Sequence, residues 1–329
     1  MTHEEPTPLI EARNLAFRFP IKRRWPLQAR RYARAVDGIS FTIATGETLG
    51  LVGESGCGKS TTGKLILALL DAAEGEIRLE GRPLAGRSAA EWRALRRNMQ
   101  MIFQNPIDAL NPRLPVGDQI REVMREHRTV LADQREGALA ELVRSVGLHP
   151  DLLTRYPHQL SGGQLQRIVI ARALSLSPKL LVCDEAVAAL DVSVRAQIVN
   201  LLADLRVKHG LSYLFISHDL SVVRHICDRV AVMYLGRIVE TAPAETLFER
   251  PAHPYTRALI SAVPVPDPAV RRQRILLEGE PPSVLSPPGG CTFHTRCAHA
   301  IDLCRREAPK AQPMVSGQTV ACHRAKELA

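Results

Sequence analysis

Short apolar runs alternate with amphipathic stretches along most of this chain of 329 residues. The runs 47–52, 180–183 and 213–216 are too short for helices and predict buried strands. Residues 192–209 and 220–227, on either side of the last run, predict helices. Alternating buried strands and helices are typical of a parallel α/β core. We therefore predict an α/β fold.

Other stretches predict structure beside that core. The region 116–156 is mostly helical in its pattern, and 88–97 predicts a further helix. Gly236 separates two apolar runs that predict a hairpin-like pair. The further strands are expected at 9–19, 35–43, 76–79, 99–103, 229–234 and 237–240.

The run 47–52 ends in the sequence GESGCGKST, which fits the P-loop pattern Gly-x4-Gly-Lys-Ser/Thr. The glycines let successive N–H groups point at phosphate oxygens, and a following helix, expected at 59–70, presents its positive end to the same anion. Lys59 is expected to reach the β- and γ-phosphates of ATP, and Ser60 to bind Mg²⁺. The expected ATP-binding residues of this loop are Gly53, Ser55, Gly56, Cys57, Gly58, Lys59, Ser60 and Thr61.

Two acidic residues follow the run 180–183. Asp184, at the end of that predicted strand, suits a direct or water-mediated contact with Mg²⁺. Glu185 is placed to orient or deprotonate the attacking water. An acidic pair that merely ends a strand is the alternative, and the P-loop upstream makes it the weaker one.

The sequence LSGGQ at 160–164 opens a helix that is expected to run to about Ser175. Ser161 and the backbone of Gly162 and Gly163 form a second helix N-terminus able to receive an anion. One ATP does not need two such cradles from one domain. The nucleotide site is therefore expected to be split between two copies of the fold.

At this point the chain resembles the ATP-binding subunit of an ABC transporter. In that family the signature helix of one subunit covers the γ-phosphate held by the P-loop of the other. The resemblance implies a P-loop NTPase of the ABC type with an antiparallel β subdomain, a helical subdomain and a C-terminal cysteine-rich extension. The implied domains are a nucleotide-binding domain at 1–262, with the helical subdomain at about 116–160, and a C-terminal region at 263–329.

The resemblance assigns further site residues. Gln104 matches the glutamine that senses Mg²⁺ and meets the membrane subunit, so Mg²⁺ is expected at Ser60, Gln104 and Asp184. Asp191 matches the loop that crosses the dimer interface. His218 matches the histidine that contacts the γ-phosphate, and it joins Glu185 as a catalytic residue. The signature residues offered to the partner's site are Ser161, Gly162, Gly163 and Gln164.

One assignment has a rival, and one segment departs from the family pattern. Phe19 best matches the aromatic residue that stacks on adenine, although Pro20–Arg34 resembles an insertion before the P-loop and Phe17 is a rival. The sequence DEAVAALD at 184–191 lacks the Pro-Thr-Ser that many members have after the acidic pair. Both acids and the interface Asp191 are kept, so we expect ATPase activity to survive.

The composition supports an ATPase that works with other chains. Hydrophobic residues make up 45% of the chain, which is ample for a core, yet no apolar run reaches eighteen residues. The N-terminus lacks the basic-then-apolar pattern of a signal peptide, so we expect the protein to stay in the cytoplasm. A transporter built on this chain would need other chains to supply the pore.

A net charge of +9 raises the question of anionic partners. Basic residues are densest at 21–34, where Trp25 and Tyr32 are interspersed and no acid occurs. A solvated loop is the favoured interpretation, contact with anionic lipid or a membrane subunit comes second, and nucleic acid comes last. We expect no nucleic-acid partner. The basic residues are Lys22, Arg23, Arg24, Arg30, Arg31 and Arg34.

Prolines punctuate 263–290 and predict an extended connector. Four of the seven cysteines follow it in the spacing C-x5-C-x6-C-x17-C. Disulfides are disfavoured in a cytoplasmic chain, so a metal or cluster site is favoured over free thiols. The tight knuckle of structural zinc is absent, while Fe–S clusters tolerate other spacings. His294, His299 and His323 are alternative ligands.

The C-terminal third resembles oligopeptide/dipeptide-type ABC ATPases in HPYT at 253–256 and GCTFHTRC at 290–297. In that subfamily four cysteines are associated with a [4Fe–4S] cluster, here Cys291, Cys297, Cys304 and Cys322. The sequence MYLGRIVE at 233–240 and the long stretch before the P-loop favour the second of its two paired ATPase types.

The resemblance implies an ATP-hydrolysing subunit that powers peptide import, with ATP and Mg²⁺ as cofactors. The implied partners are a sister ABC ATPase in a heterodimer, two membrane-spanning permease subunits and an extracytoplasmic substrate-binding protein. The chain would lie peripherally at the cytoplasmic face of the inner membrane. An importer of nickel, glutathione or a sugar is the alternative, and a soluble ABC ATPase is less favoured because only one cassette is present.

Overall fold

The computed structural model describes residues 7–21, 32–263, 274–314 and 317–328. The chain divides into two compact units. The first unit combines Met1–Ile43, Thr48–Ala85 and Ser217–Ala329, and the second combines Ala44–Glu47 with Gly86–Ile216. Most of the basic segment lies outside the described residues (Lys22, Arg23, Arg24, Trp25, Arg30 and Arg31), as do the connector prolines Pro264, Pro266 and Pro268.

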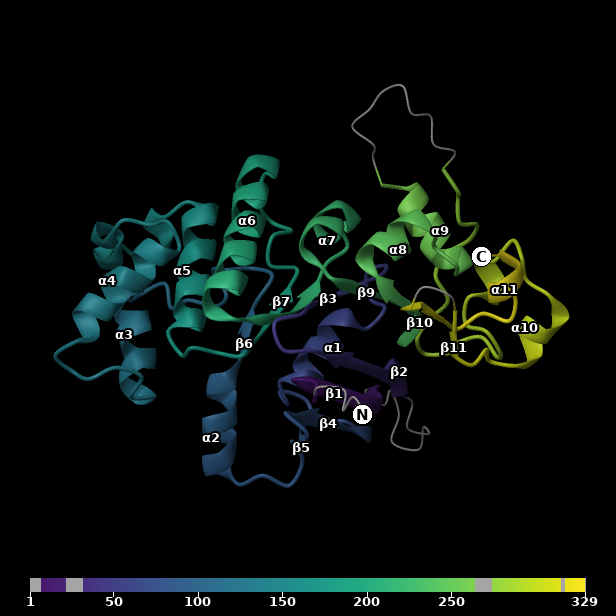
Figure 1. Cartoon of the computed structure of the whole chain (residues 1–329), viewed down its shortest axis with the longest axis horizontal. Coiled ribbons are helices and arrows are strands. Elements are labelled where there is room, and N and C mark those ends of the chain that lie inside the picture. Colours follow the sequence, from purple (N-terminus) through teal and green to yellow (C-terminus); the bar gives the residue numbers. More distant parts are fainter. Residues whose placement is uncertain (1–6, 22–31, 264–273, 315–316, 329) are drawn as a thin grey trace, which may run out of the picture. The chain divides into compact units, whose positions relative to one another are not determined.

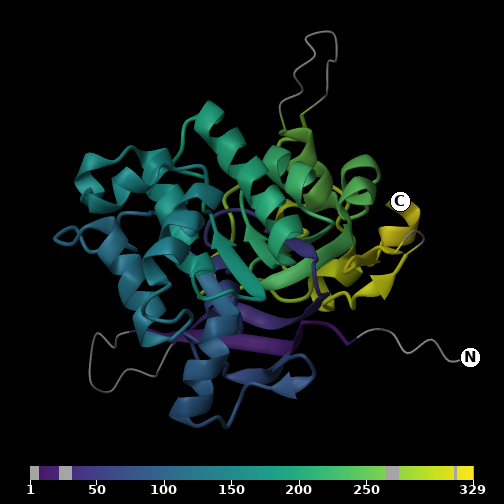
Figure 2. The ribbon, with the colours of Figure 1, turned by 60° about the vertical axis from the view of Figure 1, so that its left-hand side comes forward.

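The first unit contains a four-stranded antiparallel sheet in the order β2-β1-β4-β5. Its long strands are β1 (Ile10–Pro20) and β2 (Tyr32–Ile43), followed by β4 (Glu74–Leu79) and β5 (Arg82–Pro83), drawn in purple to blue in Figure 2. Strands alternate their side chains between two faces, so one row can be buried while the other faces solvent. The buried row includes Ile10, Ala12, Leu15, Val36, Ile39, Ile43, Ile77 and Leu79.

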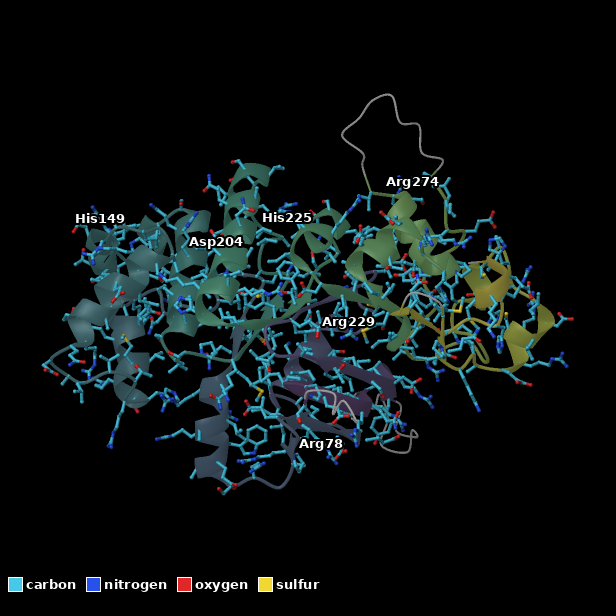
Figure 3. All side chains as sticks on the ribbon, in the orientation of Figure 1. Arg78, His149, Asp204, His225, Arg229 and Arg274 are labelled. Carbon is cyan, nitrogen blue, oxygen red and sulfur yellow. The ribbon has the colours of Figure 1, made fainter. Side chains whose placement is uncertain are left out.

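The first unit also holds strands in the order β11-β12-β10-β9-β3. The P-loop strand β3 (Thr48–Val52) is parallel to β9 (Arg229–Tyr234), and β9 is antiparallel to β10 (Arg237–Pro243). The predicted hairpin around Gly236 is therefore confirmed. Arg229, labelled in Figure 3, opens β9 and donates to the carbonyl of Thr42 at 3.4 Å.

The C-terminal region extends this strand order. Short strands β11 (Gln312–Pro313) and β12 (Thr319–Val320) pair antiparallel, and β12 also pairs with β10. The sequence pattern did not reveal them, because two-residue strands carry no measurable periodicity. The helices of this unit are α1 (Lys59–Ile66), α7 (Leu220–Ile226), α8 (Ala244–Glu249), α9 (Pro254–Ser261), α10 (Asp302–Arg306) and α11 (Ala325–Leu328).

The second unit is built on three parallel strands in the order β8-β7-β6. These are β8 (Ser212–Ile216), β7 (Leu180–Asp184) and β6 (Met99–Ile102), and every residue of β7 and β8 is buried. Continuous burial is the expected state of parallel strands covered on both faces. The predicted α/β core is confirmed here.

Helices surround these strands. In Figure 1, α3 (Val116–Glu126), α4 (Arg135–Ser145) and α5 (Gly162–Leu174) pack together. The other helices are α2 (Ala89–Asn98) and α6 (Val192–His209). His149, labelled in Figure 3, caps a short 3₁₀ turn at Pro150–Thr154. The predicted helical region is confirmed, while the domain boundaries proposed from the sequence stay a prediction.

One predicted helix is too long. The helix after the P-loop was expected at 59–70, but α1 ends at Ile66. Ala68 adopts a positive φ of 46°, and its N–H donates to the Leu65 carbonyl at 2.9 Å. A left-handed residue ends an α-helix because it turns the next N–H groups away from the helical ladder.

Across the described parts of the chain, no helix combines the length and the apolar character needed to cross a bilayer.

Candidate nucleotide-binding site

The P-loop is shaped by glycines that no other residue can replace. Gly53 has a φ of 151°, and a Cβ atom there would lie 2.1 Å from the Met233 carbonyl oxygen. Gly58 has a φ of 107°, and its Cβ would lie 2.1 Å from the Ala35 carbonyl oxygen. Both contacts are with backbone, which cannot move aside as a flexible side chain can. The close approach of β9 and β2 therefore fixes the path of the loop.

Lys59 is enclosed by the loop that it follows. The residue is 4% exposed, and Nζ donates to the carbonyls of Gly53 at 2.8 Å and Glu54 at 2.9 Å. Ser60 and Thr61 follow in the first turn of α1, and the N-cap is Gly58, which has no side chain to cap the helix. The loop thus gathers a buried ammonium group and a helix N-terminus, which is the arrangement that binds phosphate.

Glu54 joins the loop to residues far along the chain. Its carboxylate accepts two bonds from the Arg296 guanidinium, at 2.8 and 3.1 Å. Its backbone N–H donates to the Tyr255 hydroxyl at 2.8 Å. The ion pair with Glu54 raises the pKa of the Arg296 guanidinium above its ordinary value. Tyr255 and Arg296 therefore hold one residue of the P-loop from far along the chain.

A buried series of hydrogen bonds supports Tyr255. The Glu240 carboxylate accepts from the N–H groups of Ala252 and His253, both at 2.9 Å, and His253 Nδ1 accepts from the Tyr255 N–H at 3.1 Å. Burial lowers the pKa of His253 to about 3, so its ring stays neutral and can accept this bond. The ring of Phe293 contacts those of Tyr234, Tyr255 and His253 with centroids 5.2–5.6 Å apart.

In the second unit, the residues after β7 form a strained and connected turn. Asp184 is the last residue of β7 and is buried. Glu185 has a positive φ of 48°, and its N–H donates to the Ile216 carbonyl at 3.0 Å. Gln104 Nε2 donates to Glu185 Oε2 at 3.2 Å. Non-glycine residues with positive φ are uncommon and concentrate at functional sites. The structure thus brings Gln104 and Glu185 together, as a shared role requires.

The LSGGQ sequence caps its own helix. Ser161 is the N-cap of α5, and its hydroxyl accepts from the Gln164 N–H at 3.3 Å while Gln164 Oε1 accepts from the Ser161 N–H at 2.9 Å. A Cβ on Gly163 would lie 2.6 Å from Val194 Cγ1 on α6. Gly163 therefore permits the close approach of α5 and α6, and Ser161 and Gly162 lie exposed at the helix start.

The remaining predicted site residues are Asp191, His218 and Phe19. Asp191 caps α6, and its carboxylate accepts from the Val194 N–H at 2.9 Å. His218 is exposed and follows β8 along the chain. Phe19 is 43% exposed at the end of β1, edge-on to Phe17 with ring centroids 4.8 Å apart. The nucleotide-contacting roles of these residues stay predictions.

The four tail cysteines (Cys291, Cys297, Cys304 and Cys322) share one neighbourhood but no metal geometry. Within the described ranges, no three His, Cys, Asp or Glu side chains are grouped closely enough to hold a metal ion. The Cys291 N–H donates to the Cys304 carbonyl at 2.8 Å, and a Cβ on Gly290 would lie 2.4 Å from that same oxygen. Burial raises the pKa of the Cys291 thiol to about 11, and the other three thiols add to the increase.

Those thiols match a group bound by four thiolates in donor type alone, because the described side chains are not gathered around one point. Ligands of this kind are protonated without a cation and lose their protons when they bind one. Cys57, Cys183 and Cys227 are buried elsewhere, and burial raises the pKa of Cys183 to about 12. Burial also raises the pKa of the Cys57 thiol, and a buried thiol with a raised pKa and no neighbouring cysteine is unreactive.

Sequence reasoning missed Glu54, Tyr255 and Arg296 as parts of the site. Tyr255 lies within HPYT and Arg296 within GCTFHTRC, and both sequences indicated only a family resemblance. The acidic residue in the P-loop sequence could have indicated a basic partner. A carboxylate between two glycines of a phosphate-binding loop requires a counter-charge, and an arginine is the residue best suited to supply it.

Family models match two parts of the chain. Residues 36–188 match the ABC transporter model, and residues 239–304 match the model described as oligopeptide/dipeptide transporter, C-terminal region. The oligopeptide transport ATP-binding protein OppF of Escherichia coli is 50% identical over 307 residues, covering 92% of each chain. AppF of Bacillus subtilis, also an oligopeptide transport ATP-binding protein, is 46% identical over 326 residues, covering 98% of this chain and 99% of its own.

Solved structures share the fold. CbiO1 of Clostridium perfringens, part of an ABC transporter complex, aligns with a TM-score of 0.64 at 24% identity, over 74% of this chain and 92% of its own. An ATP-binding cassette solved as a dimer in a post-hydrolysis state, bound to ADP and phosphate, aligns with a TM-score of 0.63 at 25% identity, over 71% and 98%. The chain belongs to the ABC transporter ATPases and, within them, to the group that carries the oligopeptide/dipeptide transporter C-terminal region.

Proposed function

We propose that this chain is the ATP-hydrolysing subunit of a multi-subunit importer of dipeptides or oligopeptides. The observation that carries the proposal is the attachment of the peptide-transporter C-terminal region to the P-loop, through Tyr255 and Arg296. Relatives named for oligopeptide transport, at 46–50% identity over nearly the whole chain, support peptides over nickel, glutathione or sugars as the cargo.

The proposed chemistry is hydrolysis of ATP to ADP and phosphate. The P-loop N–H groups and Lys59 bind the phosphates, and Ser60, Gln104 and Asp184 are the proposed Mg²⁺ contacts. Glu185, held by Gln104, orients or deprotonates the attacking water, and His218 contacts the γ-phosphate. Phe19 stacks on the adenine. Ser161, Gly162, Gly163 and Gln164 close the partner's nucleotide site, and Asp191 lies at the interface between the two ATPases.

We infer the partners from the same group of proteins. A sister ABC ATPase supplies the second half of each nucleotide site, and two permease subunits form the pore. An extracytoplasmic receptor delivers the peptide. The chain would then lie peripherally on the cytoplasmic face of the inner membrane, and the positive charge of the sequence at 21–34 suits contact with anionic lipid or the permease.

We also propose that the tail cysteines hold a [4Fe–4S] cluster in a C-terminal extension at 263–329. Their donor type and shared neighbourhood support it, and a bound cluster would supply an all-thiolate cross-link between distant parts of the tail. Iron and sulfide analysis after anaerobic purification tests this directly. About four irons per chain, lost in a Cys291→Ser variant, would support the cluster, and an iron-free anaerobic protein would refute it.

Reconstitution tests the transport function. The chain is purified with its permease partners in liposomes, and phosphate release is measured with the receptor loaded in turn with peptide, Ni²⁺, glutathione or sugar. We expect peptide-loaded receptor to stimulate hydrolysis and the other ligands to leave it at the basal rate. Stimulation by a non-peptide ligand alone would reassign the cargo, and a chain that copurifies with no membrane protein would be a soluble ATPase.

A further inference from the structure

The C-terminal region holds the P-loop through an ion pair that the nucleotide motifs do not include. Arg296 Nη1 donates to Glu54 Oε2 at 2.8 Å, and Nη2 donates to Oε1 at 3.1 Å. The Arg296 side chain is 7% exposed and that of Glu54 is 29% exposed. Two parallel bonds between a guanidinium and a carboxylate fix the orientation of both groups. Arg296 directly precedes Cys297, so the pair ties the cysteine-bearing segment to the loop.

The backbone of Glu54 links this ion pair to Lys59, the phosphate-binding lysine. The Glu54 carbonyl accepts from Lys59 Nζ at 2.9 Å and from the Cys57 N–H at 3.3 Å. Its N–H donates to the Tyr255 hydroxyl. A shift of Glu54 therefore moves the oxygen on which the Lys59 ammonium rests, and misplaced binding groups lose affinity steeply.

The carboxylate of Glu54 also has an electrostatic consequence. It lies one residue after Gly53, in a loop that binds a polyphosphate, and like charges repel strongly where water is partly excluded. The loop can carry this residue only if a positive charge compensates it. Arg296 supplies that charge, and it holds both carboxylate oxygens.

We propose that Arg296 is a positioning residue for ATP binding. By compensating the charge of Glu54, it keeps that carboxylate from repelling the phosphates and from displacing the Glu54 carbonyl that contacts Lys59 Nζ. The proposal rests on the proposed function, since it requires ATP at this P-loop. A simple structural clamp between tail and loop makes a different prediction, because it loses as much when Glu54 is neutralised as when Arg296 is.

Binding of a fluorescent ATP analogue to the full-length chain separates the two. In Arg296→Gln, the uncompensated carboxylate should raise the Kd for ATP about tenfold, which corresponds to the loss of one favourable charge contact. Glu54→Gln should stay within about threefold of the wild type. The double variant should recover most of the affinity lost in Arg296→Gln, because the repelling charge is gone.

Two further variants complete the design. Arg296→Lys keeps the charge but cannot form the two parallel bonds of the guanidinium. Its Kd should therefore lie between those of the wild type and Arg296→Gln. Arg121→Gln is the matched control, because it breaks another two-bonded ion pair, with Glu136, outside the P-loop. Its Kd should not change. Turnover of the assembled complex at saturating ATP should fall by less than about threefold in Arg296→Gln, which assigns the effect to binding.

Several results would overturn the proposal. These are a wild-type Kd in Arg296→Gln, a double variant as weak as Arg296→Gln, or a loss of turnover with Kd unchanged. Arg296→Gln failing to fold while Arg296→Lys binds ATP normally would assign the pair to stability alone and would also overturn it. If the wild-type chain neither binds nor hydrolyses ATP, the proposed function itself fails. If it does both and the variants match it, only this inference fails.

Discussion

Two helices of this protein begin with glycine-containing motifs, and their first turns are built in opposite ways. Helix α1 begins after Gly58, which has a left-handed backbone and no side chain to cap the helix. Helix α5 begins after Ser161, which forms a reciprocal capping box with Gln164. The backbone of the P-loop cannot accept a Cβ at Gly58, whereas a Cβ at Gly162 would meet only Leu190 Cδ2 at 3.7 Å.

This difference indicates different tasks for two similar motifs. The P-loop combines a buried ammonium group with a helix N-terminus, so it can bind an anion from within one chain. The start of α5 is satisfied by its own side chains and is exposed, so it can be complete before any nucleotide arrives. A surface of that kind suits contact with a nucleotide held elsewhere, which agrees with the proposed exchange of sites between two ATPases.

The largest expected effect separates ATP binding from ATP cleavage. Glu185→Gln should lower phosphate release by about a hundredfold or more, because a general base contributes that much to the rate. Binding of ATP at the P-loop should be unchanged, since Gln keeps the shape and can still bond to Gln104. Phosphate release and binding of a fluorescent analogue are measured on the same preparation. Near-normal hydrolysis would refute the assignment of Glu185.

The next prediction tests the asymmetry of the two helix starts. Lys59→Ala should weaken ATP binding to the isolated full-length chain by about thirtyfold, because a hydrogen bond to a charged group is lost. Ser161→Ala should leave that affinity unchanged, although losing the cap should lower the free energy of unfolding by about 1 kcal/mol. Calorimetric titration and urea unfolding check both. Equal losses of affinity in the two variants would contradict the comparison.

A matched pair of glycine substitutions tests the backbone difference. Gly58→Ala should lower the free energy of unfolding by about 2 kcal/mol or more, because it combines a left-handed backbone with a clash against Ala35. Gly162→Ala should change it by less than about 0.5 kcal/mol, since the new methyl makes an ordinary contact. Chemical denaturation of the full-length chain provides both values. A well-tolerated Gly58→Ala would show that the loop is less constrained than its geometry indicates.

The smallest expected effect concerns the pH dependence of stability that arises from the buried hydrogen bonds of Glu240, His253 and Tyr255. His253 has a folded pKa of about 3, well below its unfolded value of about 6.5. The unfolded chain therefore takes up a proton between these values that the folded chain does not. His253 therefore does not lower the free energy of unfolding above pH 6.5. Below that pH, the free energy of unfolding falls by up to about 1.4 kcal/mol for each pH unit.

The His253→Asn variant isolates that contribution. Asn keeps a side chain able to cap α9 but does not titrate, so the variant should lose stability less steeply between pH 6.5 and 5 than the wild type. Urea unfolding midpoints over that range give the two slopes, and Glu240, whose pKa burial raises, is present in both proteins. Identical slopes would mean that His253 does not stay neutral in the fold.

The sequence predicted the parts of this molecule that rest on local rules. The strands β3, β7 and β8 follow from short apolar runs, and α5 follows from its cap and helical period. The nucleotide motifs were found because phosphate binding needs glycines, a lysine and a hydroxyl at fixed spacing. The left-handed Ala68, which ends α1 early, has no such signal, because alanine otherwise favours helix.

The C-terminal region shows what local rules cannot supply. Arg296 and Glu54 are 242 residues apart, and only the folded chain joins them. The short strands β11 and β12 have no periodicity of their own and form because β10 offers them an edge. Long-range pairings of this kind depend on tertiary structure, so a pattern in one segment cannot reveal them.

The pairing of β12 with β10 has a consequence for how the protein behaves in a crowded cell. Glu240 and Thr241 of β10 lie opposite Val320 and Thr319, so the chain covers a row of backbone groups that would otherwise form an open sheet edge. Open edges are templates for aggregation. The strands β11 and β12 therefore guard β10 against self-association, and proteolytic loss of residues 312–328 would expose that edge.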